Sequence, residues 1–170
     1  MSLWGSEDIM PVTFNPATRQ DRISVFSTME IERTLRFVMW GYAAPTLGDW
    51  MDATESLEMY IGSDEQGFAM ATWAFPLQGR ALPVHFVGAR RVFAMADEYA
   101  RAMCRMWFDT HQEASCLLGI TPRPFGHVFR HSLRIGWKRH GEIPCACVLG
   151  SGRCVSAVIT SLDRESGGEE

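Results

Sequence analysis

The sequence predicts an α/β protein with a mixed, mostly antiparallel sheet flanked by helices on both faces. Three observations support this fold class. Short segments alternate apolar and polar residues, longer segments repeat apolar residues every three or four positions, and turn-forming residues separate the two kinds. One strand–helix–strand step, through residues 91–120, implies a crossover connection and a parallel pair of strands.

The N-terminal part of the chain opens with a short strand at residues 12–14, which ends at a turn. Ser27 and Glu30 have the spacing of a capping box, so the sequence predicts a helix that begins at Ser27. Apolar residues continue at helical spacing as far as Met39. Residues 42–55 are expected to form a loop or a short helix.

The segment from residue 57 to residue 161 completes the predicted sheet. The expected strands are residues 57–61, 68–75, 81–87, 115–120, 145–149 and 154–161. Two amphipathic helices, at residues 90–109 and 128–135, separate the later strands. Gly150-Ser151-Gly152 joins the last two strands as a hairpin turn.

Length and composition indicate one globular domain. The 170 residues fit a single unit, which we place at residues 9–162, with frayed termini at residues 1–8 and 163–170. A hydrophobic content of 46% and a charged content of 21% exclude a disordered chain. The formal net charge of −4 argues against a nucleic-acid partner.

The sequence also indicates a compartment. No apolar run approaches the roughly 20 residues that a transmembrane helix needs, so no membrane association is expected. The first ten residues contain Glu7 and Asp8 and no basic segment, so no signal peptide is expected. Five cysteines, an odd number, argue against a disulfide framework. Together these features predict a cytoplasmic protein.

One stretch near the C-terminus resembles a known family. Residues 131–143 contain Gly136-Trp137, where a helix stops and an aromatic side chain turns back to the core, followed by Gly141-Glu142. This pattern and the order of elements across residues 12–162 resemble the GCN5-related N-acetyltransferase (GNAT) superfamily. Because Val84-His85-Phe86 precedes the central helix, the chain looks in particular like small GNAT-like proteins of phages and prophages.

The resemblance implies an acetyl-CoA-dependent N-acetyltransferase, in which an amine attacks the thioester directly. His85 is then the general base that deprotonates the amine, because histidine titrates near neutral pH. Ser132 lies where the family commonly has the tyrosine that protonates the leaving thiolate, so Ser132 or a water molecule would take that role. The acceptor would be a small-molecule or protein amine.

The same resemblance implies the contacts to acetyl-CoA. The backbone of Phe86, Val87 and Gly88 would hold the acyl carbonyl and the pantetheine arm. Family members place a Gln/Arg-x-x-Gly-x-Gly/Ala loop before the central helix, where backbone amides bind the diphosphate. The corresponding segment of this chain keeps a single glycine, so Arg90 and Arg91 are the candidate phosphate ligands.

These departures from the family pattern keep a second hypothesis open. With a degenerate phosphate loop and serine in place of tyrosine, the protein could be a catalytically inactive GNAT-like phage or prophage module. Such a module would bind a phage or host protein or take part in virion assembly. Association with a second copy of the chain also stays open. The presence of His85 and the arginine pair favours the enzyme.

Each candidate site also has a purely structural interpretation. His85 could be a hydrogen-bonded, half-buried histidine, and the arginine pair a solvated helix end. The basic run at residues 127–140 could meet an acidic partner, but a solvated helix face is favoured. Aromatic side chains gather in the first half of the chain and could line a pocket, although such side chains more often fill a core. They are Trp40, Tyr42, Trp50 and Trp73.

Three cysteines near His140 raise the question of a zinc site. Cys145 and Cys147 are expected on one face of a strand, and Cys154 could lie across the hairpin from them. Zinc ligands are usually spaced Cys-x₂₋₄-Cys, and thiols at alternate strand positions are ordinary core residues. No metal site is therefore predicted.

Overall fold

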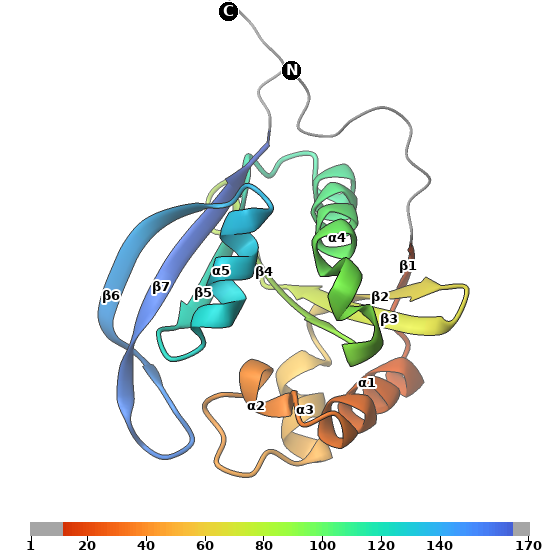
Figure 1. Ribbon diagram of the computed structural model, residues 1–170, viewed down its shortest axis with the longest axis horizontal. Helices are drawn as coiled ribbons and strands as arrows, with labels where there is room; N and C mark the ends of the chain where they lie inside the picture. Colours follow the sequence, from red (N-terminus) through yellow and green to blue (C-terminus); the bar gives the residue numbers. More distant parts are fainter. Residues whose placement is uncertain (1–11, 165–170) are drawn as a thin grey trace, which may run out of the picture.

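The computed structural model describes residues 12–164, which form a seven-stranded sheet in the order β1-β2-β3-β4-β5-β7-β6 (Figure 1). The strands are β1 (Thr13–Pro16), β2 (Glu58–Asp64), β3 (Gly67–Ala74), β4 (Ala81–Gly88), β5 (Cys116–Pro122), β6 (Lys138–Val148) and β7 (Cys154–Asp163). β4 and β5 are parallel, and the other neighbours are antiparallel. The mixed sheet confirms the predicted fold class. Each predicted strand is present, but the strand predicted at residues 145–149 begins at Lys138, because residues 138–143 already pair with β7.

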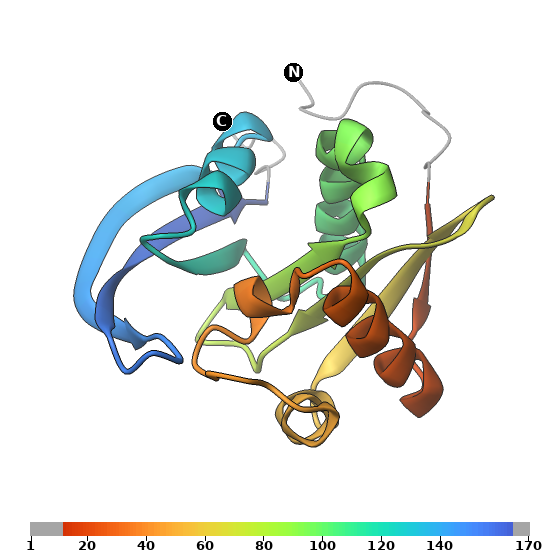
Figure 2. The ribbon, with the colours of Figure 1, turned by 60° about the horizontal axis from the view of Figure 1, so that its bottom comes forward.

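Helices cover both faces of this sheet, as Figures 1 and 2 show. The helices are α1 (Arg19–Ile31), α2 (Leu35–Val38), α3 (Leu47–Thr54), the 3₁₀ helix η1 (Arg90–Met95), α4 (Ala96–Thr110) and α5 (Gly126–Arg134). The first three lie on one face, and α4 and α5 lie on the other. Each face has its own cluster of buried apolar side chains. Within residues 12–164 no helix is both long enough and apolar enough to cross a bilayer.

The first helix begins earlier than the sequence predicts. Thr18 caps α1: its Oγ1 accepts from the amide of Asp21 at 3.2 Å, and Asp21 Oδ2 accepts from the amide of Thr18 at 2.8 Å. The predicted start at Ser27 is wrong, because Ser27 lies inside α1 and its hydroxyl donates to the carbonyl of Ile23 at 3.1 Å. The predicted helix through Met39 is also interrupted, because the chain turns through a positive φ of 59° at Arg33. Only the short α2 follows.

The crossover helix also begins differently from its prediction at Arg90. The chain first forms η1 and becomes α-helical at Ala96. Arg91 fixes η1 to the β2–β3 hairpin, because its Nη1 and Nη2 donate to the two carboxylate oxygens of Asp64 at 2.7 and 2.8 Å. Tyr99 donates to the same carboxylate at 2.7 Å. The ion pair with Arg91 is the largest cause that lowers the pKa of Asp64 below its usual value.

β4 and β5 stay together over a short distance. They pair at Ala81, Leu82 and Pro83 of β4 and then diverge. β4 continues alongside β3 as far as Gly88, whereas β5 continues alongside β7 as far as Pro122. The sheet therefore consists of two halves that share one short parallel contact, and a gap opens between them toward the C-terminal ends of these strands (Figure 2).

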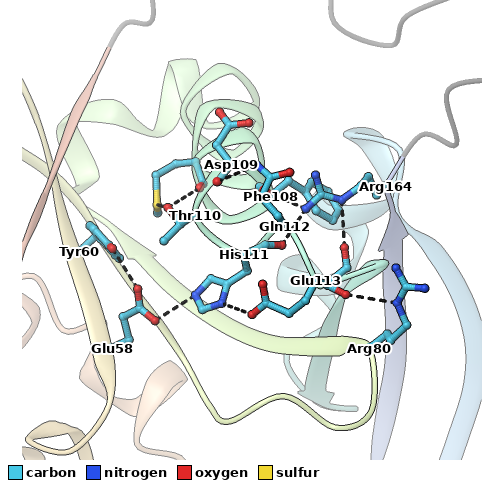
Figure 3. A network of polar contacts seen from close by, with 12 residues as sticks. Glu58, Tyr60, Arg80, Phe108, Asp109, Thr110, His111, Gln112, Glu113 and Arg164 are labelled. Carbon is cyan, nitrogen blue, oxygen red and sulfur yellow. Dashed lines mark hydrogen bonds and ion pairs between the residues drawn. The ribbon is translucent and has the colours of Figure 1, made fainter.

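The predicted C-terminal boundary is too early. Asp163 ends β7, and Arg164, expected to be frayed, is anchored under the end of α4 (Figure 3). The guanidinium of Arg164 donates to the carbonyls of Phe108 at 2.6 Å, His111 at 2.7 Å and Ala114 at 3.0 Å. The other residues predicted to be frayed, 1–8 and 165–170, lie outside the described residues.

A second set of polar contacts closes this end of the molecule. His111 lies between two carboxylates: its Nε2 is 2.9 Å from Glu58 Oε2, and its Nδ1 is 3.2 Å from Glu113 Oε1 (Figure 3). Glu58 also accepts from the hydroxyl of Tyr60 at 2.9 Å. These contacts tie the end of α4 to β2.

We expect Arg164→Ala to lower the free energy of unfolding by about 2–3 kcal/mol, because carbonyls at the end of α4 lose a charged donor. Urea denaturation at neutral pH measures this loss. The matched control is Arg153→Ala, which removes an exposed arginine from the β6–β7 turn and should change stability by less than about 0.5 kcal/mol. Equal losses in the two variants would contradict the capping role.

Candidate functional site

The gap between β4 and β5 opens into a cavity of about 380 Å³. Its walls come from α2 and the residue Trp40 beyond it, from β4 and β5, from η1 and α4, and from α5. Most of the side chains that line it are apolar. A concave, mostly apolar cavity with a few polar groups is the usual form of a small-molecule site, so this cavity is the candidate functional site.

His85 lies in β4 and forms part of the wall. Its ring is stacked between Trp40, at 5.6 Å between centroids, and Trp73, at 5.9 Å. The edge of Phe75 approaches from a third side at 5.3 Å. No described residue forms a hydrogen bond with the ring nitrogens of His85.

The surroundings of His85 make it a neutral base. Burial among the aromatic rings lowers the pKa of His85 from 6.5 to about 4. At neutral pH the imidazole is therefore uncharged and has a lone pair available on one ring nitrogen. The structure thus places a histidine without a hydrogen-bond partner among the described residues at the wall of the cavity.

The backbone of β4 presents polar groups to the gap. The carbonyl of Pro83 accepts from Phe75, and the amide of Ala89 donates to Ala69, so these groups of β4 face β3. Because backbone groups alternate sides along a strand, those of Phe86 and Gly88 face the gap, while those of Val87 face β3. Of the predicted backbone ligands, Phe86 and Gly88 are therefore placed to bind a ligand in the gap and Val87 is not.

The two candidate phosphate ligands, Arg90 and Arg91, lie in different surroundings. The guanidinium of Arg91 is held by Asp64 and by the carbonyls of Gly67 and Phe68. These contacts within the fold compete with phosphate for Arg91, whose role as a phosphate ligand stays a prediction. The side chain of Arg90 is exposed at the start of η1. Its backbone amide donates to Glu32 Oε2 at 2.9 Å.

Ser132 lines the cavity from α5 and is buried. Its hydroxyl donates to the carbonyl of Val128, one turn earlier, at 3.4 Å. Tyr99 also lines the cavity, but its phenol donates to Asp64 and its pKa is raised by burial. A phenolic acid that is free to protonate a leaving group is therefore absent from the described lining residues.

Sequence reasoning missed His131, which was placed on a solvated helix face. Its Nε2 lies 3.0 Å from Asp97 Oδ1, and its ring contacts Phe86 at 6.0 Å between centroids. Burial lowers its pKa below the usual value. The signal was present: Val128, His131 and Ser132 are spaced three and four residues apart, which places them on one face of α5.

Two contacts connect the helical face to the C-terminal half across the mouth of the cavity. The ring of Phe37 in α2 packs edge-on against Phe125 at 5.3 Å and against His127 at 4.8 Å. The amide of Gly150 donates to the carbonyl of Trp40 at 2.7 Å. The tip of the β6–β7 hairpin therefore lies beside the α2–α3 segment (Figures 1 and 2).

The three hairpin cysteines do not gather into a metal site. Cys147 is buried, whereas Cys145 and Cys154 are exposed. The shared face predicted for Cys145 and Cys147 is wrong, because Cys145 has a φ of 50° within an irregular part of β6. His140 is directed to Ser161 at 2.7 Å instead. Among residues 12–164 no group of three or more histidine, cysteine or acidic side chains could hold a metal ion.

The basic run on α5 and β6 forms ion pairs. Arg134 lies 3.0 Å from Asp97, Lys138 lies 2.8 Å from Asp163, and Arg139 pairs with Glu142. The exposed basic side chains agree with the solvated face favoured from the sequence, whereas His127 and His131 of the same run line the cavity.

Comparisons with known proteins now connect this geometry to a fold. No family model and no curated protein sequence matches the chain. The spermidine N-acetyltransferase from Vibrio cholerae, crystallised with CoA and spermine, is 8% identical with a TM-score of 0.73, over 90% of this chain and 95% of that chain. AAC(6′)-Ib with ribostamycin and coenzyme A is 16% identical with a TM-score of 0.69, over 94% and 99%. The ribosomal-protein-S5-alanine acetyltransferase from Vibrio fischeri is 9% identical with a TM-score of 0.68, over 96% and 98%.

The chain therefore has the fold of the GNAT acetyltransferases. The alignments extend over 90–96% of this chain, so the shared fold includes both halves of the sheet. At these identities the likeness describes the fold, and residue roles depend on the site itself. The phage or prophage resemblance and the cytoplasmic location stay predictions.

We expect His85→Phe to remove part of the pH dependence of stability. The unfolded chain protonates His85 below its ordinary pKa of 6.5, whereas the folded chain does so near about 4. The stabilisation is complete above pH 6.5 and is lost as the pH falls toward 4. Between pH 7 and pH 5 the wild type should lose roughly 1–2 kcal/mol more than the variant, measured by urea denaturation. Parallel pH profiles of stability in the wild type and in His85→Phe would contradict the lowered pKa of His85.

We expect Gly150→Ala to detach the hairpin from the helical face. A Cβ at Gly150 would lie 2.2 Å from the carbonyl oxygen of Tyr42, so the backbone must move. The loss should be about 1–3 kcal/mol, with faster amide exchange in the β6–β7 turn. Ser151→Ala, at the next position of the same turn, is the control and should leave exchange unchanged. Unaltered exchange in Gly150→Ala would show that the contact is not maintained in solution.

Proposed function

We propose that the protein is an acyl-CoA-dependent N-acyltransferase that transfers an acetyl group to an amine. The observation that carries this proposal is the gap between β4 and β5. It places the unpaired backbone groups of Phe86 and Gly88 and the neutral ring of His85 at one cavity. The fold shared with N-acetyltransferases that were crystallised with CoA supports the same donor.

The fit of this donor can be judged from the residues present. A pantetheine arm is an extended chain with two amides, and the free edge of β4 offers it a strand-like partner at Phe86 and Gly88. The apolar walls suit its methyl groups and an acyl group. In this proposal the thioester carbonyl accepts a hydrogen bond from one of these backbone amides, which favours the charge that develops on the oxygen during attack.

His85 and solvent complete the reaction. The amine nitrogen bonds to the thioester carbon, the C–S bond breaks, and the proton lost by nitrogen passes to His85. The thiolate then gains a proton from water, because Ser132 is a weak acid whose hydroxyl is bonded to Val128 and Tyr99 is bonded to Asp64. Ser132 therefore shapes the wall in this proposal and is not assigned the proton transfer.

The diphosphate would meet Arg90 at the start of η1. In the fold as it stands, Glu32 accepts from the amide of Arg90, which is the kind of group that binds phosphate at a helix start. A diphosphate would compete with this carboxylate for the amide and would be repelled by its charge. Glu32 therefore weakens donor binding, and Arg90 strengthens it.

Calorimetric titration with acetyl-CoA tests this proposal. We expect micromolar affinity, weakened about 3- to 10-fold in Arg90→Ala by the loss of one charge contact. Glu32→Gln removes the competing charge and should tighten binding by a similar factor. Ile31→Gln, at the adjacent exposed position, is the matched control and should leave the affinity unchanged. The absence of heat up to millimolar acetyl-CoA would overturn the proposed donor.

A further inference from the structure

The charges around the cavity limit the kind of amine that it can accept. None of the described residues that line it carries a carboxylate. Its ionisable side chains are His85, Tyr99, His127, His131 and Arg134. Burial lowers the pKa of each of the three histidines, so they are mainly uncharged at neutral pH. The remaining charge of these side chains is the positive charge of Arg134.

The described carboxylates beside the cavity already have partners. Asp97 lies 3.0 Å from both His131 and Arg134, and Glu32 accepts from the amide of Arg90. A cation that enters an apolar cavity needs an opposite charge or several oxygen acceptors to offset the loss of its hydration. A polyamine or an aminoglycoside, which carries several ammonium groups, would find no carboxylate among the described residues of these walls.

Part of the apolar wall is aromatic. Phe37 contributes from α2 and Trp40 from the segment after it, and His85 stacks against Trp40. Phe37 is in turn held edge-on by Phe125. Flat side chains fixed at these angles favour a flat partner, because aromatic rings pack offset or edge-to-face.

The low basicity of His85 also argues against a cationic amine. An alkylammonium keeps its proton up to a pKa near that of lysine, about 10.4, and a histidine whose pKa lies at about 4 is too weak to remove it. An aromatic amine is already uncharged at neutral pH, so its lone pair is free to attack. After the N–C bond forms, the nitrogen is positively charged and acidic, and His85 can take its proton as the C–S bond breaks.

We propose that the acceptor is an uncharged aromatic amine carried on an apolar scaffold, and not a polyamine or an aminoglycoside. This inference rests on the proposed function for the transfer step. The choice of ligand class rests on the walls alone: no carboxylate among the described lining residues, an aromatic surface at Phe37 and Trp40, and a neutral histidine between two tryptophans.

The test compares two amines with the same carbon skeleton. p-Toluidine is aromatic and neutral at pH 7.5, whereas 4-methylcyclohexylamine is saturated and cationic; spermidine is the polycationic reference. Release of thiol from acetyl-CoA gives kcat/KM for each amine, and calorimetry without acetyl-CoA gives their affinities. We expect both kcat/KM and the binding affinity to be at least about 10-fold higher for p-toluidine than for either of the other amines.

The outcomes separate the two proposals. If p-toluidine binds selectively but no thiol is released, the acyltransferase proposal fails and the ligand class stands. If spermidine or 4-methylcyclohexylamine is acetylated more efficiently than p-toluidine, the ligand class is wrong and the acyltransferase stands. If none of the amines binds or reacts, the ligand class is also overturned.

A charge-introducing variant tests the cause of the selectivity. Val38→Glu adds a carboxylate to the wall at α2, and we expect the preference for p-toluidine over 4-methylcyclohexylamine to fall at least about 10-fold. Ile143→Glu adds the same charge at an exposed position of β6 and should keep the preference. If Val38→Glu does not fold, Trp40→Leu serves instead. This variant should weaken the binding of p-toluidine more than the binding of 4-methylcyclohexylamine. An unchanged preference in a folded variant would refute the inference.

Discussion

The short parallel contact between β4 and β5 is the constraint on which the remaining structure depends. Each strand keeps an antiparallel partner over its length, β3 for β4 and β7 for β5, and the two strands share only the pairs at Ala81, Leu82 and Pro83. Longer pairing would use the backbone groups of Phe86 and Gly88 within the sheet. Because the strands separate, these backbone groups remain unpaired and a cavity lies beside them.

Packing against Gly119 keeps the C-terminal half in place as the strands diverge. A Cβ at Gly119 would lie 2.7 Å from Thr160 Oγ1 and 3.1 Å from the ring of Trp137. The glycine lets the indole approach the backbone of β5, while the Arg91–Asp64 pair holds η1 against the β2–β3 hairpin of the other half. The two halves are thus stabilised separately, and the cavity lies where neither half fills the space.

The sequence predicted the strands well because alternation and turn residues are local signals. The sequence prediction was wrong where one local pattern fits two structures. Ser27 and Glu30 match a capping box at the start of a helix, but both lie inside α1. Of the residues that line the cavity, it singled out His85, Phe86 and Gly88, and it named Trp40 as a candidate pocket residue. It could not show that Asp64 accepts from Arg91, or that Phe37 reaches the cavity, because these contacts join segments far apart in the chain.

The position of β7 has a consequence for synthesis of the protein. β7 is the last of the described strands, yet it lies between β5 and β6 in the sheet. During translation, β5 and β6 therefore emerge without the strand that joins them, and Arg164 reaches the end of α4 later still. The half with β4 can form before β7 is made, but β5 and β6 gain their shared partner only when β7 has emerged. A nascent chain without β7 would thus have no complete binding site.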